Sequence, residues 1–281
     1  MKFADLPNEY SNLQNSEIVI LPVPYDGTST WQKGADRGPE ALIEASANME
    51  LYDIETDSQV YLKGIHTAQP VDVDMSPEKM VESVEKSVRH FLNKDKFVVL
   101  VGGEHSVSTG SVRAHLEKYK EFSVLQLDAH SDLRDEYEGT KYNHACVMAR
   151  IAETCPIVQV GIRSTDISEK EALSKSNVFY AENIHNSNDW VKEVTSLLSD
   201  KVYITIDLDV FDPSIMPSTG TPEPGGLLWY NVLMLLKAVF DDKKVLGFDV
   251  VELCPNPNNK GPDFLAAKLI YKLLSYKYLS I

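Results

Sequence analysis

The sequence has few cysteines, no long apolar run and no excess of basic residues, and each lack excludes a class of protein. The three cysteines, Cys146, Cys155 and Cys254, are an odd number without the spacing of a zinc site, so we expect reduced thiols in a cytoplasmic protein. The longest apolar runs, such as 97–101, are far shorter than the roughly 20 residues that a membrane span needs. The first nine residues contain no apolar stretch followed by a small-residue cleavage site, so we expect no signal peptide. We therefore expect a soluble protein without a membrane partner.

Acidic residues outnumber basic ones, with 42 aspartates and glutamates against 27 lysines and arginines and a net charge of −15. Nucleic acids and acidic membranes bind basic faces, so this balance argues against both as partners. Repeats, low-complexity tracts and linker-like segments are also missing. The hydrophobic content of 43% is enough for a sizeable core, and we expect residues 1–281 to form a single domain.

Apolar runs typical of buried strands alternate with helical patterns along the whole chain. Strands are expected at 17–23, 60–65, 97–101, 122–127, 156–161, 177–180, 201–206 and 245–251, and helices at 38–48, 77–92, 108–119, 143–153, 189–198, 227–240 and 261–276. This alternation predicts right-handed crossovers and a mainly parallel sheet of about eight strands with helices on both faces. Periodicity alone does not separate such an open sheet from a (β/α)₈ barrel.

Metal-binding side chains follow three of these strands. They are four carboxylates and two imidazoles: His105, Asp128, His130, Asp132, Asp207 and Asp209. Within 128–132 the three ligands alternate, so an extended backbone would point them to one face. Ligand sites of open α/β sheets lie beyond the carboxyl ends of the strands, where we expect all six to converge. An acidic surface loop is the alternative, but carboxylates buried at a strand end cost several kcal/mol each unless they are paired or metal-bound.

The donor set suits two metal ions better than one, because a single ion cannot use six such ligands together with a reactive water. Oxygen donors dominate, imidazole is second and no cysteine takes part, which favours Mn²⁺ over structural zinc. The charge of two divalent ions would balance the four aspartates, and a bridging hydroxide would leave the cluster slightly negative. Such a cluster favours a cationic substrate such as a guanidinium.

Five segments resemble signature segments of the ureohydrolase family, which includes the arginases and agmatinases. They are 24–27, 102–106, 128–132, 207–213 and 218–226, in family order and with family-like spacing. The resemblance spans nearly the whole chain and implies an open three-layer α/β/α sandwich instead of a barrel. It also implies a division of ligands between two Mn²⁺ ions. In that pattern Asp128 and Asp207 bridge both ions, His105 and Asp132 complete one site, and His130 and Asp209 complete the other.

Two further residues have roles that the resemblance implies. Glu252 matches the family's Asp-Xaa-Xaa-Glu segment, where the carboxylate holds the guanidinium through a paired hydrogen bond. By position His144 resembles the histidine that assists Asp132 in proton delivery to the leaving amine, and an ordinary histidine titrates near neutrality. Without the resemblance, His144 would be interpreted as a helix cap or a surface residue. Asp249 is predicted to be structural, and Glu104 is not a predicted ligand because its parity is opposite to that of His105.

The predicted reaction is hydrolysis of a guanidino compound to urea and an amine. Residues 137–143 lack the Ser/Asn-rich pattern with which arginases hold an α-amino acid. The acidic side chains of Asp135, Glu136 and Glu138 instead suit a terminal ammonium, which favours agmatine, giving putrescine for polyamine biosynthesis. N1-aminopropylagmatine, 4-guanidinobutyrate, arginine and formiminoglutamate are the alternatives within the family. A zinc deacetylase of the same fold is an alternative of another class. Family members often form trimers or hexamers, so a homo-oligomer is expected.

Overall fold

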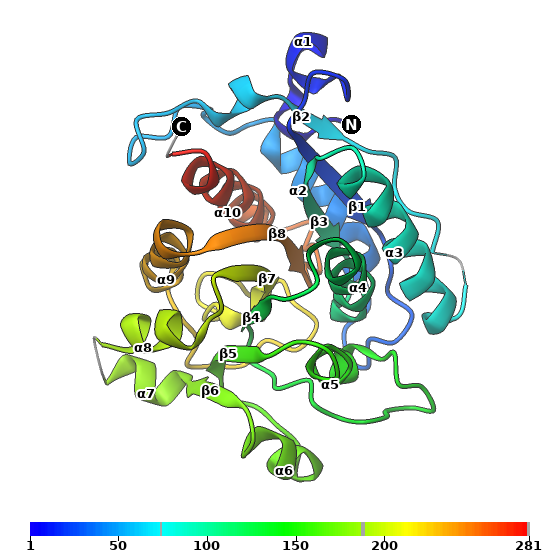
Figure 1. Cartoon of the computed structure of the whole chain (residues 1–281), viewed down its shortest axis with the longest axis vertical. Coiled ribbons are helices and arrows are strands. Elements are labelled where there is room, and N and C mark those ends of the chain that lie inside the picture. The colour runs from blue at the N-terminus through cyan, green and yellow to red at the C-terminus, as the bar shows by residue number, and fades with distance from the viewer. Residues whose placement is uncertain (74, 187–188, 280–281) are drawn as a thin grey trace.

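A single eight-stranded sheet forms the centre of the protein in a computed structural model that describes residues 1–73, 75–186 and 189–279 (Figure 1). The strands are β1 Ile18–Val23, β2 Ile65–Thr67, β3 Phe97–Gly102, β4 Ser123–Leu127, β5 Ile157–Ile162, β6 Asn177–Tyr180, β7 Lys201–Asp207 and β8 Lys244–Val251. Their order across the sheet is β2-β1-β3-β8-β7-β4-β5-β6, and every pairing between them is parallel. The predicted parallel sheet is therefore confirmed.

Helices cover both faces of this sheet and make it the middle of three layers. The helices are α1 Asn8–Ser11, α2 Gly38–Ser46, α3 Pro77–Leu92, α4 Ser108–Tyr119, α5 Val147–Ala152, α6 Lys170–Leu173, α7 Ala181–His185, α8 Trp190–Leu197, α9 Trp229–Asp242 and α10 Gly261–Lys277. In Figure 1, α3, α4 and α5 lie on one side of the sheet and α8, α9 and α10 on the other. None of the described helices is long and apolar enough to cross a lipid bilayer.

The core is divided by the sheet, because neighbouring strand residues point to opposite faces. Ile18 and Ile20 of β1 pack in the cluster that includes α2, α9 and α10, whereas Val19 packs in the cluster that includes α3. Every residue of β1 and β3 is buried. Strands covered on both faces are continuously apolar, which explains why apolar runs located them in the sequence.

Several segments differ from the predicted elements. Val60–Lys63 is a short 3₁₀ helix, and β2 begins only after Gly64, whose φ of 75° turns the chain. The helix predicted at 143–153 starts as a 3₁₀ turn at His144–Cys146 before α5. The short helices α1, α6 and α7 were not predicted, because four or five residues are too few for a helical period to be recognised.

The strand order determines where the functional site can form. β3, β8, β7 and β4 are four consecutive strands of the sheet, although they come from distant parts of the chain. Because they are parallel, their carboxyl ends meet at one edge. The residues that follow these four strands are therefore neighbours in space.

Candidate metal centre

All six predicted ligands follow the ends of three of these four strands. His105 opens a 3₁₀ helix, His105–Val107, just beyond β3, and the segment 128–132 follows β4. Asp207 is the last residue of β7, and Asp209 lies in the 3₁₀ helix that follows it. The structure brings these six side chains together, and Glu252 joins them from the end of β8.

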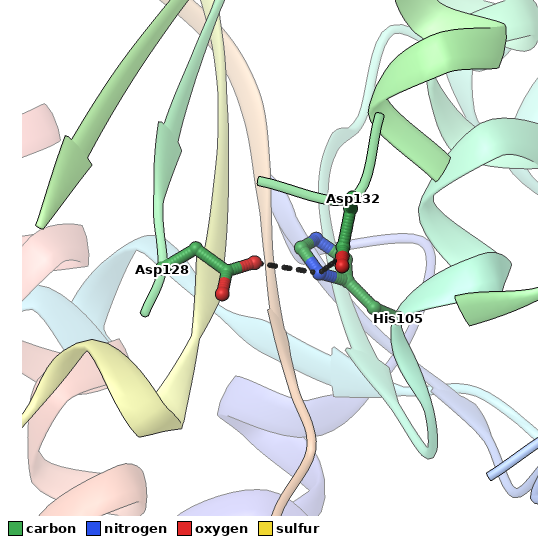
Figure 2. A group of neighbouring side chains, drawn as sticks. All are labelled: His105, Asp128 and Asp132. Atoms are coloured by element: carbon green, nitrogen blue, oxygen red, sulfur yellow. Dashed lines mark ion pairs between the residues drawn. The ribbon is translucent and has the colours of Figure 1, made fainter. Parts of the chain in front are cut away.

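One group of ligands surrounds the imidazole of His105 (Figure 2). Its Nδ1 lies 3.1 Å from Oδ2 of Asp128 and 3.1 Å from Oδ2 of Asp132, and all three side chains are buried. Oδ2 of Asp207 lies 3.5 Å from the same nitrogen. Three carboxylates thus converge on one ring nitrogen in the interior.

A second group surrounds His130, whose Nδ1 lies 2.8 Å from Oδ2 of Asp209 and 3.7 Å from Oδ1 of Asp128. Asp128 therefore belongs to both groups and offers one oxygen to each. Ligand atoms lie within 4.8 Å of one another in two sets of three residues, a spacing that one ion can span. The sets are His105, Asp128 and Asp132, and Asp128, His130 and Asp209. Asp128 is thus shared by both groups. The bridging roles of Asp128 and Asp207 stay predictions.

The hydrogen bonds around His105 leave the lone pair of its Nδ1 available to a cation. Its Nε2 lies 2.8 Å from Oγ1 of Thr205, whose own proton goes to Oδ1 of Asp249 at 2.6 Å. Nε2 must therefore donate, which leaves the lone pair on Nδ1. Buried Nδ1 has no hydrogen-bond partner in the part of the chain that the structure describes. A lone pair that faces carboxylate oxygens is stable only with a positive charge between them, so the donor set fits a metal ion.

The pKa values of the cluster lead to the same conclusion. Burial raises the pKa of Asp132 to about 7, and the neighbouring charge of Asp128 adds to this effect. Burial also raises the pKa of Asp207 well above its usual value, together with the charge of Asp209. Burial lowers the pKa of His130, but the facing carboxylates outweigh it and raise that pKa to about 12. Such a cluster retains protons in place of cations, and divalent ions would displace them.

The backbone bends sharply at two of the site residues. Asp132 has a φ of 52° and Glu252 a φ of 67°, a left-handed conformation that is costly for non-glycine residues and is concentrated at functional sites. The carbonyl of Asp132 is held by the N–H groups of Met148 and Ala149, at 3.0 and 3.1 Å. The expectation that an extended path aligns Asp132 with Asp128 is therefore wrong. A turn brings the carboxylate of Asp132 back to the cluster.

Glu252 and His144 line a cavity of about 260 Å³. Four of the six ligand residues also line it, namely His130, Asp132, Asp207 and Asp209. Oε1 of Glu252 accepts a hydrogen bond from the backbone N–H of His105 at 2.7 Å, which links the carboxylate to the cluster. Burial lowers the pKa of His144 to about 4. The expectation that His144 titrates near neutrality is wrong, because a buried imidazole beside other positive charges resists protonation.

The loop that carries Asp135, Glu136 and Glu138 does not supply these carboxylates to the cavity. Asp135 instead pairs with Arg150 at 2.6 Å and Lys141 at 3.3 Å, and neither Glu136 nor Glu138 lines the cavity. From the same loop, Arg134 and Tyr137 do line it. Trp31 and Asp166, from other segments, also line the cavity.

Several polar residues that orient the ligands escaped prediction. Gln126 donates from Nε2 to Oδ2 of Asp128 at 2.7 Å, and Thr205 accepts from His105. Arg163 donates to the carbonyl of Asp209 at 2.6 Å. The available signal was a polar residue within an otherwise apolar strand, as at Gln126 and Thr205. The predicted structural role of Asp249 is consistent with its bonds to Tyr203 and Thr205.

An open parallel sheet with aspartates and histidines gathered at its carboxyl edge defines an α/β enzyme of the metallohydrolase type. The sequence pattern of the arginase family matches residues 16–275, and the chain belongs to this family. It is 39% identical to the N(1)-aminopropylagmatine ureohydrolase of Synechocystis, over 98% of this chain and 95% of the relative. It is 41% identical to the protein of that name from Thermus thermophilus, over 95% and 92%.

Solved structures agree with this assignment. The agmatine ureohydrolase of Thermoplasma volcanium superimposes with a TM-score of 0.90 at 30% identity, covering 99% of this chain and 94% of that one. The fold is therefore arginase-like, as the resemblance implied. As an agmatinase-like member of this family, the protein is a ureohydrolase, an enzyme that hydrolyses guanidino groups.

Proposed function

We propose that this ureohydrolase releases urea from N1-aminopropylagmatine, with agmatine as the main competing substrate. The proposal is based on the relatives from Synechocystis and Thermus thermophilus, which are both named for N(1)-aminopropylagmatine. They favour this longer substrate over the agmatine expected from the sequence. Both compounds have a guanidinium at one end and an ammonium at the other. The two substrates therefore make the same demands on the cluster. They differ in the tail, where N1-aminopropylagmatine has an additional aminopropyl unit and a second positive charge.

The charges around the cavity support a cationic tail. Arg134 is the only lysine or arginine among the described residues that line the cavity, and it lies 3.4 Å from Glu169 and 3.8 Å from Asp166. Its charge is thus balanced by two carboxylates. A tail that ends in a carboxylate, as in 4-guanidinobutyrate, arginine or formiminoglutamate, would meet no free cation there.

The proposed cofactor is a pair of Mn²⁺ ions per chain, held by the six ligand residues. When bound, the pair would lower the pKa of a shared water, so that it attacks the guanidinium carbon near neutral pH. Glu252 would hold the guanidinium in place. Asp132 and His144 would move a proton to the departing amine. The two groups that share Asp128 argue against a zinc deacetylase with a single ion.

The proposal extends to the state of the protein in the cell. We propose that residues 1–281 form one domain and that the chain assembles into a trimer or a hexamer in the cytoplasm. The mass of the purified protein in solution, measured by light scattering, tests the assembly.

Urea release from a panel of guanidino compounds tests the reaction. We expect the highest kcat/KM with N1-aminopropylagmatine and a lower value with agmatine. The compounds with a carboxylate tail should react on the order of a hundredfold more slowly, because discrimination by a missing charge partner reaches that size. Elemental analysis should find manganese at two ions per chain in the most active preparation. Activity on acetylated amines without urea release would overturn the proposal in favour of the deacetylase.

A further inference from the structure

A buried carboxylate that is not among the predicted ligands is connected to His144 by hydrogen bonds. Glu104 follows β3, is fully buried and contacts Thr28 from the loop after β1. Thr28 in turn contacts both the backbone and the ring of His144. Three segments that are distant in the sequence thus meet behind the cavity.

Gly103 allows this meeting, because the chain of residues 24–28 crosses directly over the end of β3. A Cβ atom on Gly103 would lie 1.9 Å from the carbonyl oxygen of Tyr25, so only glycine fits. The N–H of Gly103 donates to Val23 and the N–H of Glu104 donates to Tyr25, both at 2.8 Å. These bonds place Thr28 against the carboxylate of Glu104.

Glu104 acts as an acceptor for all of its partners. It accepts from the N–H of Thr28 at 2.5 Å, from the hydroxyl of Thr28 at 2.6 Å and from the hydroxyl of Ser106 at 2.5 Å. The proton of the Thr28 hydroxyl is therefore directed to Glu104 and away from His144.

The remaining capacity of the Thr28 hydroxyl faces His144. A hydroxyl has one donor and two acceptor positions. The hydroxyl of Thr28 donates its hydrogen to Glu104. Its oxygen, Oγ1, accepts from the backbone N–H of His144 at 3.0 Å, and Nδ1 of the ring lies 3.3 Å away. All three positions are then filled, and Nδ1 of His144 must carry the hydrogen. Nε2 is then left with its lone pair.

We propose that Thr28 and Glu104 are positioning residues that hold His144 in the Nδ1–H tautomer, so that the lone pair of Nε2 can accept a proton from Asp132 and pass it to the leaving amine. This inference rests on the proposed hydrolysis of a guanidino compound. The edge-to-face contact between the rings of Tyr137 and His144, with centroids 6.5 Å apart, restrains the imidazole further. Neither Thr28 nor Glu104 needs to touch the substrate for this effect.

Two substitutions of Thr28 separate the hydroxyl from the shape of the side chain. Thr28→Val keeps the volume and loses the hydroxyl, whereas Thr28→Ser keeps the hydroxyl. We expect kcat of Thr28→Val to fall by on the order of tenfold to a hundredfold, because a positioned acid or base contributes about 10²–10⁴-fold and only its orientation is affected. KM should change by less than about twofold, and Thr28→Ser should stay near the wild-type kcat. Thr140→Val, in the surface loop before His144, is the matched control and should not change kcat.

The tautomer itself is measurable without turnover. In metal-free protein with ¹⁵N-labelled histidine, the signal of His144, assigned by its loss in His144→Asn, should show a protonated Nδ1 and an unprotonated Nε2. In Thr28→Val this pattern should change to a mixture of tautomers. Glu104→Gln should produce a similar mixture, and it provides a second variant if Thr28→Val unfolds.

Three results would overturn the inference. They are a wild-type His144 protonated on Nε2, a Thr28→Val variant with unchanged kcat, or equal losses in Thr28→Val and Thr28→Ser. A wild-type protein that releases no urea from any guanidino compound would instead refute the proposed function. The tautomer measurement would still decide whether Thr28 and Glu104 orient the ring.

Discussion

At the scale of single residues, neutral side chains decide which atoms of the ligands face the cluster. The hydroxyl of Thr205 fixes the proton of His105 on Nε2, and the amide of Gln126 donates to Asp128. Asp249 fixes the hydroxyl of Thr205 in turn. Each of these contacts is buried, so water cannot replace a lost partner.

The role of Thr205 leads to a prediction about metal binding. Thr205→Val should weaken the affinity for Mn²⁺ by about 10- to 100-fold, because residues that orient metal ligands typically contribute this much. Titration against a competing chelator measures the affinity. Thr205→Ser keeps the hydroxyl and should bind the metal like the wild type. Equal affinity in Thr205→Val and wild type would show that His105 needs no such partner.

A second residue-scale prediction concerns the substrate. Glu252→Gln removes a charge but retains an oxygen that can accept from the N–H of His105. We expect KM for the guanidino substrate to rise by roughly 10- to 100-fold, since a hydrogen bond to a charged group contributes about 1.5–3 kcal/mol. Manganese content should not change. If Glu252→Gln loses manganese with no change in KM of the remaining active fraction, Glu252 belongs to the metal site instead.

At the scale of elements, α10 is tied to the loop before β2 by a buried ion pair. Nζ of Lys272 lies 2.9 Å from both carboxylate oxygens of Asp53 and 2.6 Å from Oε2 of Glu55. The side chains of Lys272 and Asp53 are only 9% and 3% exposed, whereas that of Glu55 is 42% exposed, so Asp53 is the buried partner of Lys272. The pair therefore fixes α10 against residues 53–55.

Replacing Asp53 should destabilise the protein in a pH-dependent way. Asp53→Asn should lower the free energy of unfolding by about 3 kcal/mol near neutral pH, because it leaves a buried lysine without its main partner. Burial raises the pKa of Asp53, but Lys272 and Thr56 outweigh it and the pKa lies below its usual value. A lowered pKa means that the stabilisation is complete above the unfolded value of about 3.9 and is lost as the pH falls through the folded value.

Denaturant unfolding of wild type and variant checks this prediction. The difference in free energy of unfolding should be constant between about pH 5 and pH 7 and should shrink below about pH 4. Asp57→Asn, in the same loop on an exposed side chain, is the control and should change stability by less than about 0.5 kcal/mol. A difference that grows toward acid pH would contradict the ion pair.

At the scale of the whole molecule, the candidate metal centre links the carboxyl ends of neighbouring strands. Its ligands come from the ends of β3, β4 and β7, and Glu252 adds the end of β8. Without bound cations, buried carboxylates are crowded at this edge, as the raised pKa of Asp207 shows. Bound ions would therefore stabilise the folded chain as a whole.

This leads to a prediction for thermal unfolding. Removal of metal by a chelator should lower Tm, and Mn²⁺ at 100 times its Kd should restore about 2.7 kcal/mol per independent site. Scanning calorimetry with and without Mn²⁺ measures the effect. In Asp128→Asn the increase should largely vanish, because Asp128 belongs to both ligand groups. A full increase in that variant would place the stabilising ion elsewhere.

Part of this protein was determined by local sequence alone. Apolar runs located the strands because a parallel sheet buries both of its faces, as in β1 and β3. The six ligand candidates were recognised because carboxylates and imidazoles directly after such runs have few other uses. Very short segments were misplaced or missed, because three or four residues carry no clear period. The strand predicted at 60–65 lies at β2 instead, and α6 was not predicted.

Tertiary structure alone decided how these pieces form a site. The strand order β3-β8-β7-β4 depends on packing between distant segments, and no local pattern contains it. The turn at Asp132, the lowered pKa of His144 and the contact of Thr28 with Glu104 likewise depend on neighbours from other parts of the chain. Residue type and spacing act over a few positions, whereas burial and hydrogen-bond direction are properties of the folded chain. The chemistry of the ligands was thus visible in the sequence, and their geometry came from the fold.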